Sequence, residues 1–141
     1  MLVRFYQRAF TALAHDTNRP LDLVEQAFWR YNDAVCSGEM QPSELNKLLA
    51  EALEVPEVDW QKYYISAVER ITVAQDYLAT LIKKRSVGLL SNIFPGFVEA
   101  LKAAGKVPDL PYAAVVDSSE VRAIKPQFEI YKIAEAKAGV T

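Results

Sequence analysis

The sequence predicts an α/β fold, in which a helical region comes first and part of a Rossmann-like parallel sheet follows. Two observations carry this prediction. Up to about residue 73, apolar residues recur every three or four positions, which is the spacing of amphipathic helices. After residue 86, short apolar runs of strand length alternate with helical segments, and this alternation is typical of a parallel sheet. We therefore expect two regions, residues 1–73 and residues 74–141.

The helices expected up to residue 84 are separated by residues that interrupt helices. A polar turn at 15–20, the pair Ser37-Gly38 and Pro56 each break the apolar spacing. Pro42 suits the first turn of a helix, where amide donors are spare, and Asp59 suits an N-cap. The first helix is expected to bury Leu2, Phe5, Tyr6, Ala9, Phe10 and Leu13. The expected helices span residues 2–15, 21–36, 42 to just before 56, 59–68 and 73–84.

The rest of the chain is expected to alternate strand and helix. The apolar runs at 87–90 and 112–116 have the length of buried strands. A helix between them is expected to follow Pro95-Gly96 and to end at Gly105, because glycine is favoured just after a helix. Residues 118–124 are expected to be a connecting loop. A last helix is expected at 126–137.

The composition is that of an ordinary globular protein without a strong charge bias. The chain has 141 residues and a formal net charge of −2, and it contains no basic block. This balance predicts neither a nucleic-acid partner nor a membrane partner. A single cysteine, Cys36, excludes an intrachain disulfide. The sequence shows no signal peptide and no apolar run of membrane-spanning length, so we expect a cytoplasmic protein.

Polar residues stand where the predicted strands and helices meet. Ser91 and Asn92 follow the first predicted strand, and Lys125 directly precedes the last predicted helix. In open α/β sheets, ligands bind outside the carboxyl ends of the strands. A hydroxyl, an amide, a lysine and the amides of a helix start together suit a phosphate or a carboxylate. Ser91 and Asn92 are therefore the candidate substrate-binding residues of a small anionic substrate, and Lys125 is the candidate catalytic residue.

Four other conspicuous residues have simpler interpretations. The only histidine, His15, has no neighbouring metal-ligand partner, so we expect a surface or capping role. Cys36 is expected to be a small buried residue. Trp29 and Trp60 are expected to pack within the helical region.

The C-terminal segments resemble the haloacid dehalogenase (HAD) superfamily of hydrolases. The similarity lies in the order and spacing of four runs: Leu-Leu-Ser-Asn at 89–92, Val-Val-Asp-Ser-Ser-Glu at 115–120, Lys-Pro at 125–126 and Ile-Tyr at 130–131. By this resemblance, Ser91 corresponds to the residue that contacts the transferred phosphoryl group, or the substrate carboxylate in dehalogenases. Lys125 corresponds to the lysine that neutralises nucleophile and substrate.

The N-terminal region resembles the helical cap of one HAD subclass, which lies between the first and second motifs. The similar runs are Phe-Trp-Arg-Tyr at 28–31 and Ser-Gly-Glu at 37–39. The resemblance therefore implies a helical cap at 1–73 and a partial HAD-like α/β core at 74–141. It also makes Arg30 and Tyr31 candidates for substrate selection.

The sequence departs from the family pattern at the nucleophile. The 141 residues contain no Asp-x-Asp motif, and the acidic fourth motif is expected beyond the sequence. The resemblance assigns magnesium to these two motifs in phosphatases, so we expect Mg²⁺ in an intact relative and no metal ligand here. The two strands would form a remnant whose open edge favours self-association or a partner chain. We expect a fragment of a longer hydrolase that has no turnover of its own.

The leading functional hypothesis is a HAD-like phosphatase of small phosphorylated metabolites. An intact relative would act through an aspartyl nucleophile. Two alternatives remain open: a hydrolase similar to 2-haloacid dehalogenases, and a non-catalytic interaction module derived from the fold. A third alternative, an unrelated helical and α/β domain, would require Ser91 and Lys125 to lie far apart.

Overall fold

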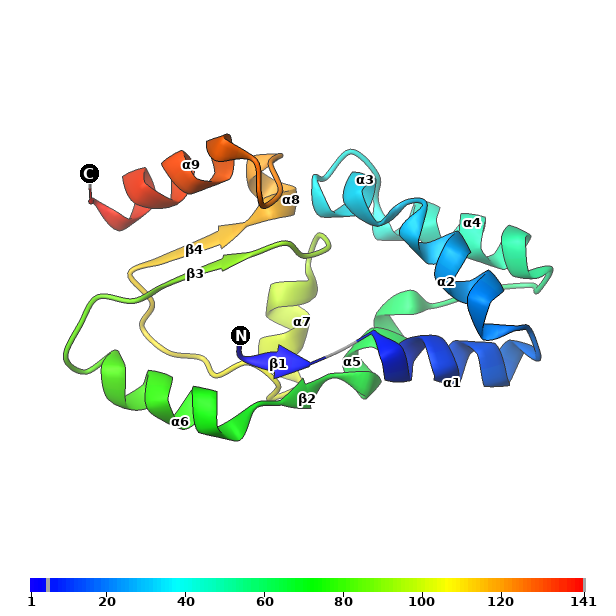
Figure 1. Cartoon of the computed structure of the whole chain (residues 1–141), viewed down its shortest axis with the longest axis horizontal. Helices are drawn as coiled ribbons and strands as arrows, with labels where there is room; N and C mark the ends of the chain where they lie inside the picture. The colour runs from blue at the N-terminus through cyan, green and yellow to red at the C-terminus, as the bar shows by residue number, and fades with distance from the viewer. Residues whose placement is uncertain (5, 141) are drawn as a thin grey trace.

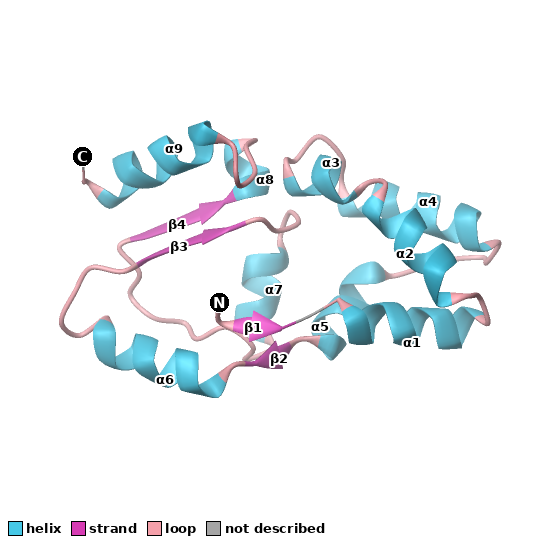
Figure 2. Ribbon diagram, in the orientation of Figure 1, coloured by secondary structure: helices cyan, strands magenta, loops and turns pink. Residues whose placement is uncertain are grey.

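The α/β prediction is confirmed by the computed structural model, which describes residues 1–4 and 6–140 (Figures 1 and 2). The expected burial of Phe5 and the assignment of Thr141 to the second region lie outside the described residues. Helices form one end of the molecule, and a small parallel sheet with its helices forms the other.

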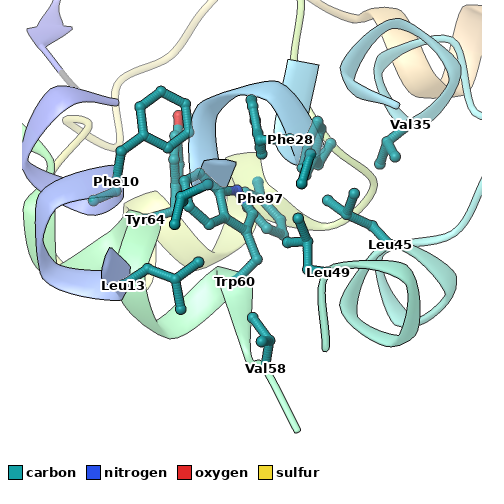
Figure 3. Close-up of a cluster of buried hydrophobic side chains, with 14 of the residues drawn as sticks. Phe10, Leu13, Phe28, Val35, Leu45, Leu49, Val58, Trp60, Tyr64 and Phe97 are labelled. Atoms are coloured by element: carbon teal, nitrogen blue, oxygen red, sulfur yellow. The ribbon is translucent and has the colours of Figure 1, made fainter. Parts of the chain in front are cut away.

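The first region folds as a helical cluster, by which we mean α1 to α5. Its core is a set of stacked and tilted aromatic rings with aliphatic side chains around them (Figure 3). Trp60 contacts both Phe28 and Phe10, with ring centroids 4.5 and 5.4 Å apart. Such ring pairs add about 0.5–1.5 kcal/mol each beyond the area that they bury. The helices are α1 (Gln7–Thr17), α2 (Leu21–Trp29), α3 (Asn32–Cys36), α4 (Pro42–Leu53) and α5 (Trp60–Ala67).

Two of the predicted helices are interrupted. The helix expected at 2–15 begins only at Gln7, because β1 (Val3–Arg4) pairs antiparallel with β2 (Glu69–Arg70). The helix expected at 21–36 divides into α2 and α3. Asn32 and Asp33 stand at the division, and their side chains hydrogen-bond each other. Asn and Asp side chains compete with the backbone bonds of a helix, which favours a break here.

The β1–β2 ribbon lies where the chain passes from the helical cluster into the second region (Figure 1). It is fastened by the buried Gln75 of α6 (Thr72–Leu81), whose amide nitrogen donates to the carbonyls of Leu2 and Lys106, each at 2.9 Å. The Gln75 side-chain oxygen accepts from Arg70 Nε at 2.8 Å. Both polar atoms of the Gln75 side chain therefore form hydrogen bonds with the ribbon or the residue next to it, and these bonds hold the ribbon against α6.

The second region contains the predicted parallel pair. β3 (Gly88–Ser91) pairs with β4 (Ala114–Asp117), with Ser91 opposite Asp117. The helix α7 (Phe97–Ala103) connects the strands, and α9 (Phe128–Ala138) packs on β4, with Ile130 fully buried against Val116. The expected loop at 118–124 is wrong in part, because it begins with the short helix α8 (Ser118–Val121). The Asp117 side chain caps this helix by accepting from the Ser119 amide.

None of the helices within residues 1–4 and 6–140 is both long enough and apolar enough to span a bilayer.

Candidate functional site

The candidate site lies where β3 and β4 end, beside the helical cluster (Figure 1). Ser91 is the last residue of β3 and is half-buried. Its register partner, Asp117, is only 5% exposed and is the last residue of β4. The parallel pairing thus brings two polar side chains to one edge of the sheet, as the sequence predicted for Ser91.

Asn92 and Lys125 hold each other through reciprocal hydrogen bonds. The Lys125 amide donates to Asn92 Oδ1 at 2.7 Å, and Asn92 Nδ2 donates to the Lys125 carbonyl at 3.1 Å. These bonds join positions 33 residues apart in sequence. The Lys125 ammonium lies 3.4 Å from the Leu90 carbonyl, one residue before Ser91. The structure therefore brings Ser91, Asn92 and Lys125 together at one edge, whereas the interpretation as an unrelated domain requires them to lie apart.

The sequence suggested that Asn92 binds substrate, whereas in the structure most of its side chain holds Lys125. Its side-chain oxygen and one of its two N–H groups are used to position Lys125. An amide nitrogen carries two hydrogens, so one remains for a ligand. The helix expected after Pro95-Gly96 is confirmed, because α7 begins at Phe97, and the buried residues Ile93 and Phe94 lie between Asn92 and its start.

The turn from β4 into α8 is a feature that sequence reasoning missed. The Ser118 side chain is fully buried, and its hydroxyl bonds both the Ile93 amide, at 3.0 Å, and the Cys36 carbonyl, at 2.5 Å. Neighbouring Asp117 accepts from the Ser119 amide and hydroxyl, at 2.9 and 2.5 Å. In the sequence, the one sign of this feature was an Asp-Ser pair directly after an apolar run. Such a pair is also typical of an ordinary turn, so it did not indicate the contacts.

Aromatic residues of the helical cluster lie beside Asn92. Tyr6, Trp60 and Tyr64 border a hollow of about 10 Å³ together with Asn92 and the residues that follow it. Burial, followed by the effect of nearby ionisable groups, raises the pKa of Tyr6 and of Tyr64 well above the usual range for tyrosine. Both phenols are therefore protonated at neutral pH. This wall is aromatic and neutral, in contrast with the lysine at the sheet edge.

The other residues that the sequence singled out lie in the helical cluster. His15 is exposed and adjoins Asp16, 3.3 Å away. Cys36 is 2% exposed, as expected for a buried small residue. Trp60 is buried in the core, whereas Trp29 is 49% exposed and its ring still contacts those of Tyr6 and Phe28.

The two candidates for substrate selection lie side by side where α2 ends. The guanidinium of Arg30 lies 5.8 Å from the ring centroid of Tyr31. Arg30 is exposed and Tyr31 is half-buried.

The sheet edge does not present a donor set for a divalent cation. Among residues 1–4 and 6–140, no three His, Cys, Asp or Glu side chains gather as metal ligands would. Magnesium prefers carboxylate and water oxygens. Besides the buried Asp117, whose Oδ1 bonds Ser119, the candidate edge offers a hydroxyl, an amide and a lysine cation, so these residues do not fit Mg²⁺.

Comparison with solved structures identifies a similar fold. The chain matches a HAD family enzyme of Bacteroides thetaiotaomicron in its magnesium complex, with a TM-score of 0.80 and 21% identity, over 99% of this chain and 73% of that chain. It also matches that enzyme in complex with magnesium and inorganic phosphate, with a TM-score of 0.69 and 18% identity, over 99% and 74% of the two chains.

A third match is a variant of the same enzyme in which an aspartate is replaced by alanine, with a TM-score of 0.76 and 20% identity, over 99% of this chain and 75% of that chain. No protein-family model and no curated protein matches the sequence. At these identities the likeness concerns the fold alone: over nearly its whole length, this chain has a fold similar to that of about three quarters of a HAD family enzyme.

Proposed function

We propose that the chain carries the anion-binding half of a HAD-type phosphatase site, for small phosphorylated metabolites. In this proposal, the Ser91 hydroxyl donates to a phosphoryl oxygen and the Lys125 ammonium neutralises its charge. Asn92 positions Lys125 and offers its remaining N–H to the ligand. A similar solved enzyme holds inorganic phosphate, which supports this choice of substrate class.

The single observation that carries the proposal is the paired hydrogen bonding of Asn92 with Lys125. Two bonds fix the backbone of an otherwise exposed lysine beside the end of β3. Both bonds are made by the backbone of Lys125, and from there its ammonium reaches the Leu90 carbonyl, one residue before Ser91. A cation fixed beside a hydroxyl is an arrangement that stabilises negative charge before the ligand arrives.

Phosphoryl transfer also needs a nucleophile, which these residues do not supply. Asp117 is the carboxylate nearest to Ser91 in the strand register, but it is buried and its Oδ1 accepts two hydrogen bonds from Ser119. A carboxylate so engaged is poorly placed to attack. We therefore propose that this chain binds phosphate and does not hydrolyse phosphate esters by itself.

The direct test is a titration of the protein with inorganic phosphate, followed by NMR or calorimetry. Lys125→Ala should weaken phosphate binding roughly tenfold or more, because a charge-assisted hydrogen bond contributes about 1.5–3 kcal/mol. Lys137→Ala, on the exposed end of α9, is the matched control and should leave binding unchanged. Equal affinity in the wild-type and Lys125→Ala proteins would exclude the proposed site.

The same titration separates the phosphatase proposal from the dehalogenase alternative. Acetate and 2-chloropropionate present a carboxylate, whereas phosphate and phosphate monoesters present a tetrahedral dianion. Tighter binding of phosphate supports the phosphatase proposal, and tighter binding of 2-chloropropionate supports the alternative. Absence of p-nitrophenyl phosphate hydrolysis, with and without Mg²⁺, is expected in either case.

An interaction module is the second candidate, and one observation favours it. Within the described residues, β3 pairs only with β4, so one side of β3 has no strand beside it. A two-stranded sheet is marginal by itself, and an unpaired strand edge favours pairing with another chain. Light scattering over a concentration series tests this candidate. A stable dimer that binds no phosphate would favour the module over the phosphatase proposal.

A further inference from the structure

A cavity of about 200 Å³ lies on the face of β4 that α9 does not cover. Side chains alternate between the two faces of a strand. Val116 packs against Ile130 of α9, so Val115 and Asp117 face the opposite side, where α7 lies (Figure 1). Val115 and Asp117 both line the cavity, and residues of α7 and α8 complete its lining.

The helix α7 contributes both to the core and to this cavity. Phe97 and Leu101 are each 2% exposed and pack in the core of the helical cluster. Glu99 and Lys102 line the cavity, and a spacing of three positions makes them neighbours on the helix surface. Val98 lines the cavity as well and is half-buried. The cavity therefore has both apolar and charged walls.

Asp117 brings to this cavity a carboxylate oxygen that no protein group uses. The residue is 5% exposed, and its Oδ1 accepts both hydrogen bonds from Ser119. Within residues 1–4 and 6–140, no donor bonds the other oxygen, Oδ2. No fully enclosed side-chain oxygen in this part of the chain lacks a partner, so Oδ2 must adjoin accessible space. The cavity that Asp117 lines supplies that space.

The charges around the cavity are not balanced. The Lys102 ammonium lies 3.7 Å from Glu99 and 3.9 Å from Asp109, so carboxylates already match its charge. Among the residues that the structure describes, neither Asp117 nor Glu120 forms an ion pair. Two carboxylates at this cavity are therefore left without a cation, one buried and one exposed.

We propose that this cavity binds a small organic cation that carries a primary ammonium group. The ammonium donates to Oδ2 of Asp117 and is stabilised by the charge of Glu120, while the carbon chain packs on Val98 and Val115. An ammonium has three donors and no acceptor, which complements a carboxylate oxygen without a donor. A cavity of about 150 Å³ holds benzene, so this one has room for a molecule of about six non-hydrogen atoms.

A metal ion fits the cavity less well than an organic cation. In the described ranges, no three His, Cys, Asp or Glu side chains gather as metal ligands would. Calcium and magnesium require about six or more oxygen ligands. The apolar side chains of Val98 and Val115 offer such an ion nothing, whereas they suit a carbon chain.

The cavity is separate from the candidate anion site. Ser91, Asn92 and Lys125 do not line it. The anion site presents a lysine cation, whereas the cavity presents unmatched carboxylates. The binding of a cation here therefore does not depend on the proposed function, and either proposal can fail while the other holds.

Titration with 1,4-diaminobutane, followed by NMR, is the direct test. The amide signals of Val98, Val115 and Glu120 should shift, whereas those of Asn92 and Lys125 should stay in place. The matched control ligand is 1,4-butanediol, which has the same length and no charge and should not bind at the same concentrations. Equal shifts with the two compounds would overturn the proposal. Shifts spread over carboxylates on the whole surface would overturn it as well.

Asp117→Asn should weaken diamine binding roughly tenfold or more, because a neutral amide replaces the carboxylate. Asparagine can still accept from Ser119, which preserves the cap of α8. Glu120→Gln changes an exposed charge and should weaken binding roughly two- to fivefold. Glu135→Gln, exposed on α9 and not part of the cavity, is the matched control and should bind as the wild type does.

Wild-type affinity in Asp117→Asn would exclude the proposed site. Circular dichroism shows whether that variant folds, and if it does not, the amide shifts of the wild type and the affinity of Glu120→Gln decide. Magnesium chloride at matched ionic strength separates the organic cation from a metal ion. If Mg²⁺ shifts the same amides at lower concentration than the diamine does, the cavity is a metal site and the proposal fails.

Discussion

The helical cluster and the β3–β4–α9 unit are stabilised in different ways. In the helical cluster, Phe28 is fully buried and contacts the rings of Tyr6, Phe10, Trp29, Trp60 and Phe94. In the β3–β4–α9 unit, the separate core consists of Val116, Ala123 and Ile130, with a few partly buried neighbours. The candidate site lies on the second, more weakly packed unit.

The difference shows how this fold separates stability from binding. Large aromatic burial stabilises the helical cluster, whereas hydrogen bonds at element ends position the site residues. Three hydrogen bonds lie at such element ends: Asn92 with Lys125, Asp117 with Ser119, and Ser118 with Cys36. Segments with little apolar burial open locally at low free energy, which suits a surface that must admit a ligand.

Phe28→Ala should have the largest effect on stability. It removes a fully buried ring from the aromatic core, which costs about 3–5 kcal/mol in the free energy of unfolding. Urea denaturation followed by circular dichroism measures this loss. Trp29→Ala is the control, because that side chain is 49% exposed and should cost clearly less. Equal losses in the two variants would contradict the view that the ring core carries the stability.

Ile130→Ala should destabilise the smaller core by about 2–4 kcal/mol, and the loss should be local. Amide exchange should become faster in β4 and α9, while the amides of α1 and α4 stay protected. Phe128→Ala on the same helix, where the side chain is 66% exposed, should change neither. A uniform loss of protection across both regions would show that the two cores unfold as one unit.

Asn92→Ala should have a modest effect on stability and a larger one on binding. Two hydrogen bonds to an exposed backbone segment are lost, at a cost of about 1–2 kcal/mol. Phosphate affinity should fall further, because Lys125 loses its fixed position. NMR titration with phosphate, beside urea denaturation of the same variant, compares the two effects. Unchanged affinity would show that the pairing with Lys125 serves the fold alone.

Tyr63→Phe should give the smallest effect, visible only in alkali. Burial, and then the hydrogen bond that the phenol donates to Asp16 at 2.7 Å, raise the pKa of Tyr63 from 10 to about 12. A group whose pKa is higher in the folded state adds stability below its unfolded pKa and loses it as pH rises. Between pH 10 and 12, the wild-type protein should therefore lose stability more steeply than the variant. Parallel thermal melts over this pH range make the comparison.

The sequence-based predictions succeeded where local pattern decides structure. Apolar spacing predicted α4 and α5 closely, since these helices bury one face and carry their own start signals, Pro42 and the Asp59 cap. The strands ending near Ser91 and Asp117 were also predicted, because short apolar runs bounded by polar residues are typical of buried strands. The functional roles of Ser91, Asn92 and Lys125 stay predictions.

Two of the failures share one physical cause, which is pairing between distant residues. The β1–β2 ribbon pairs Val3 with Arg70. No periodicity within either segment indicates a partner 67 residues away. The same holds for Ser118, whose bond to Cys36 spans 82 residues. In the sequence, Ser118 is an ordinary turn residue, because the chemistry of its side chain does not identify its partner.

Local sequence patterns were enough to predict the α/β class, the helical first region and the polar residues at the strand ends, because each depends on residues close in the chain. The tertiary structure alone decided which of those polar residues meet. It joined Asn92 to Lys125, and it buried Ser118 between the helical cluster and the sheet. Hydrogen bonds need their donors and acceptors placed to within a few tenths of an ångström, and only the packed fold supplies that placement.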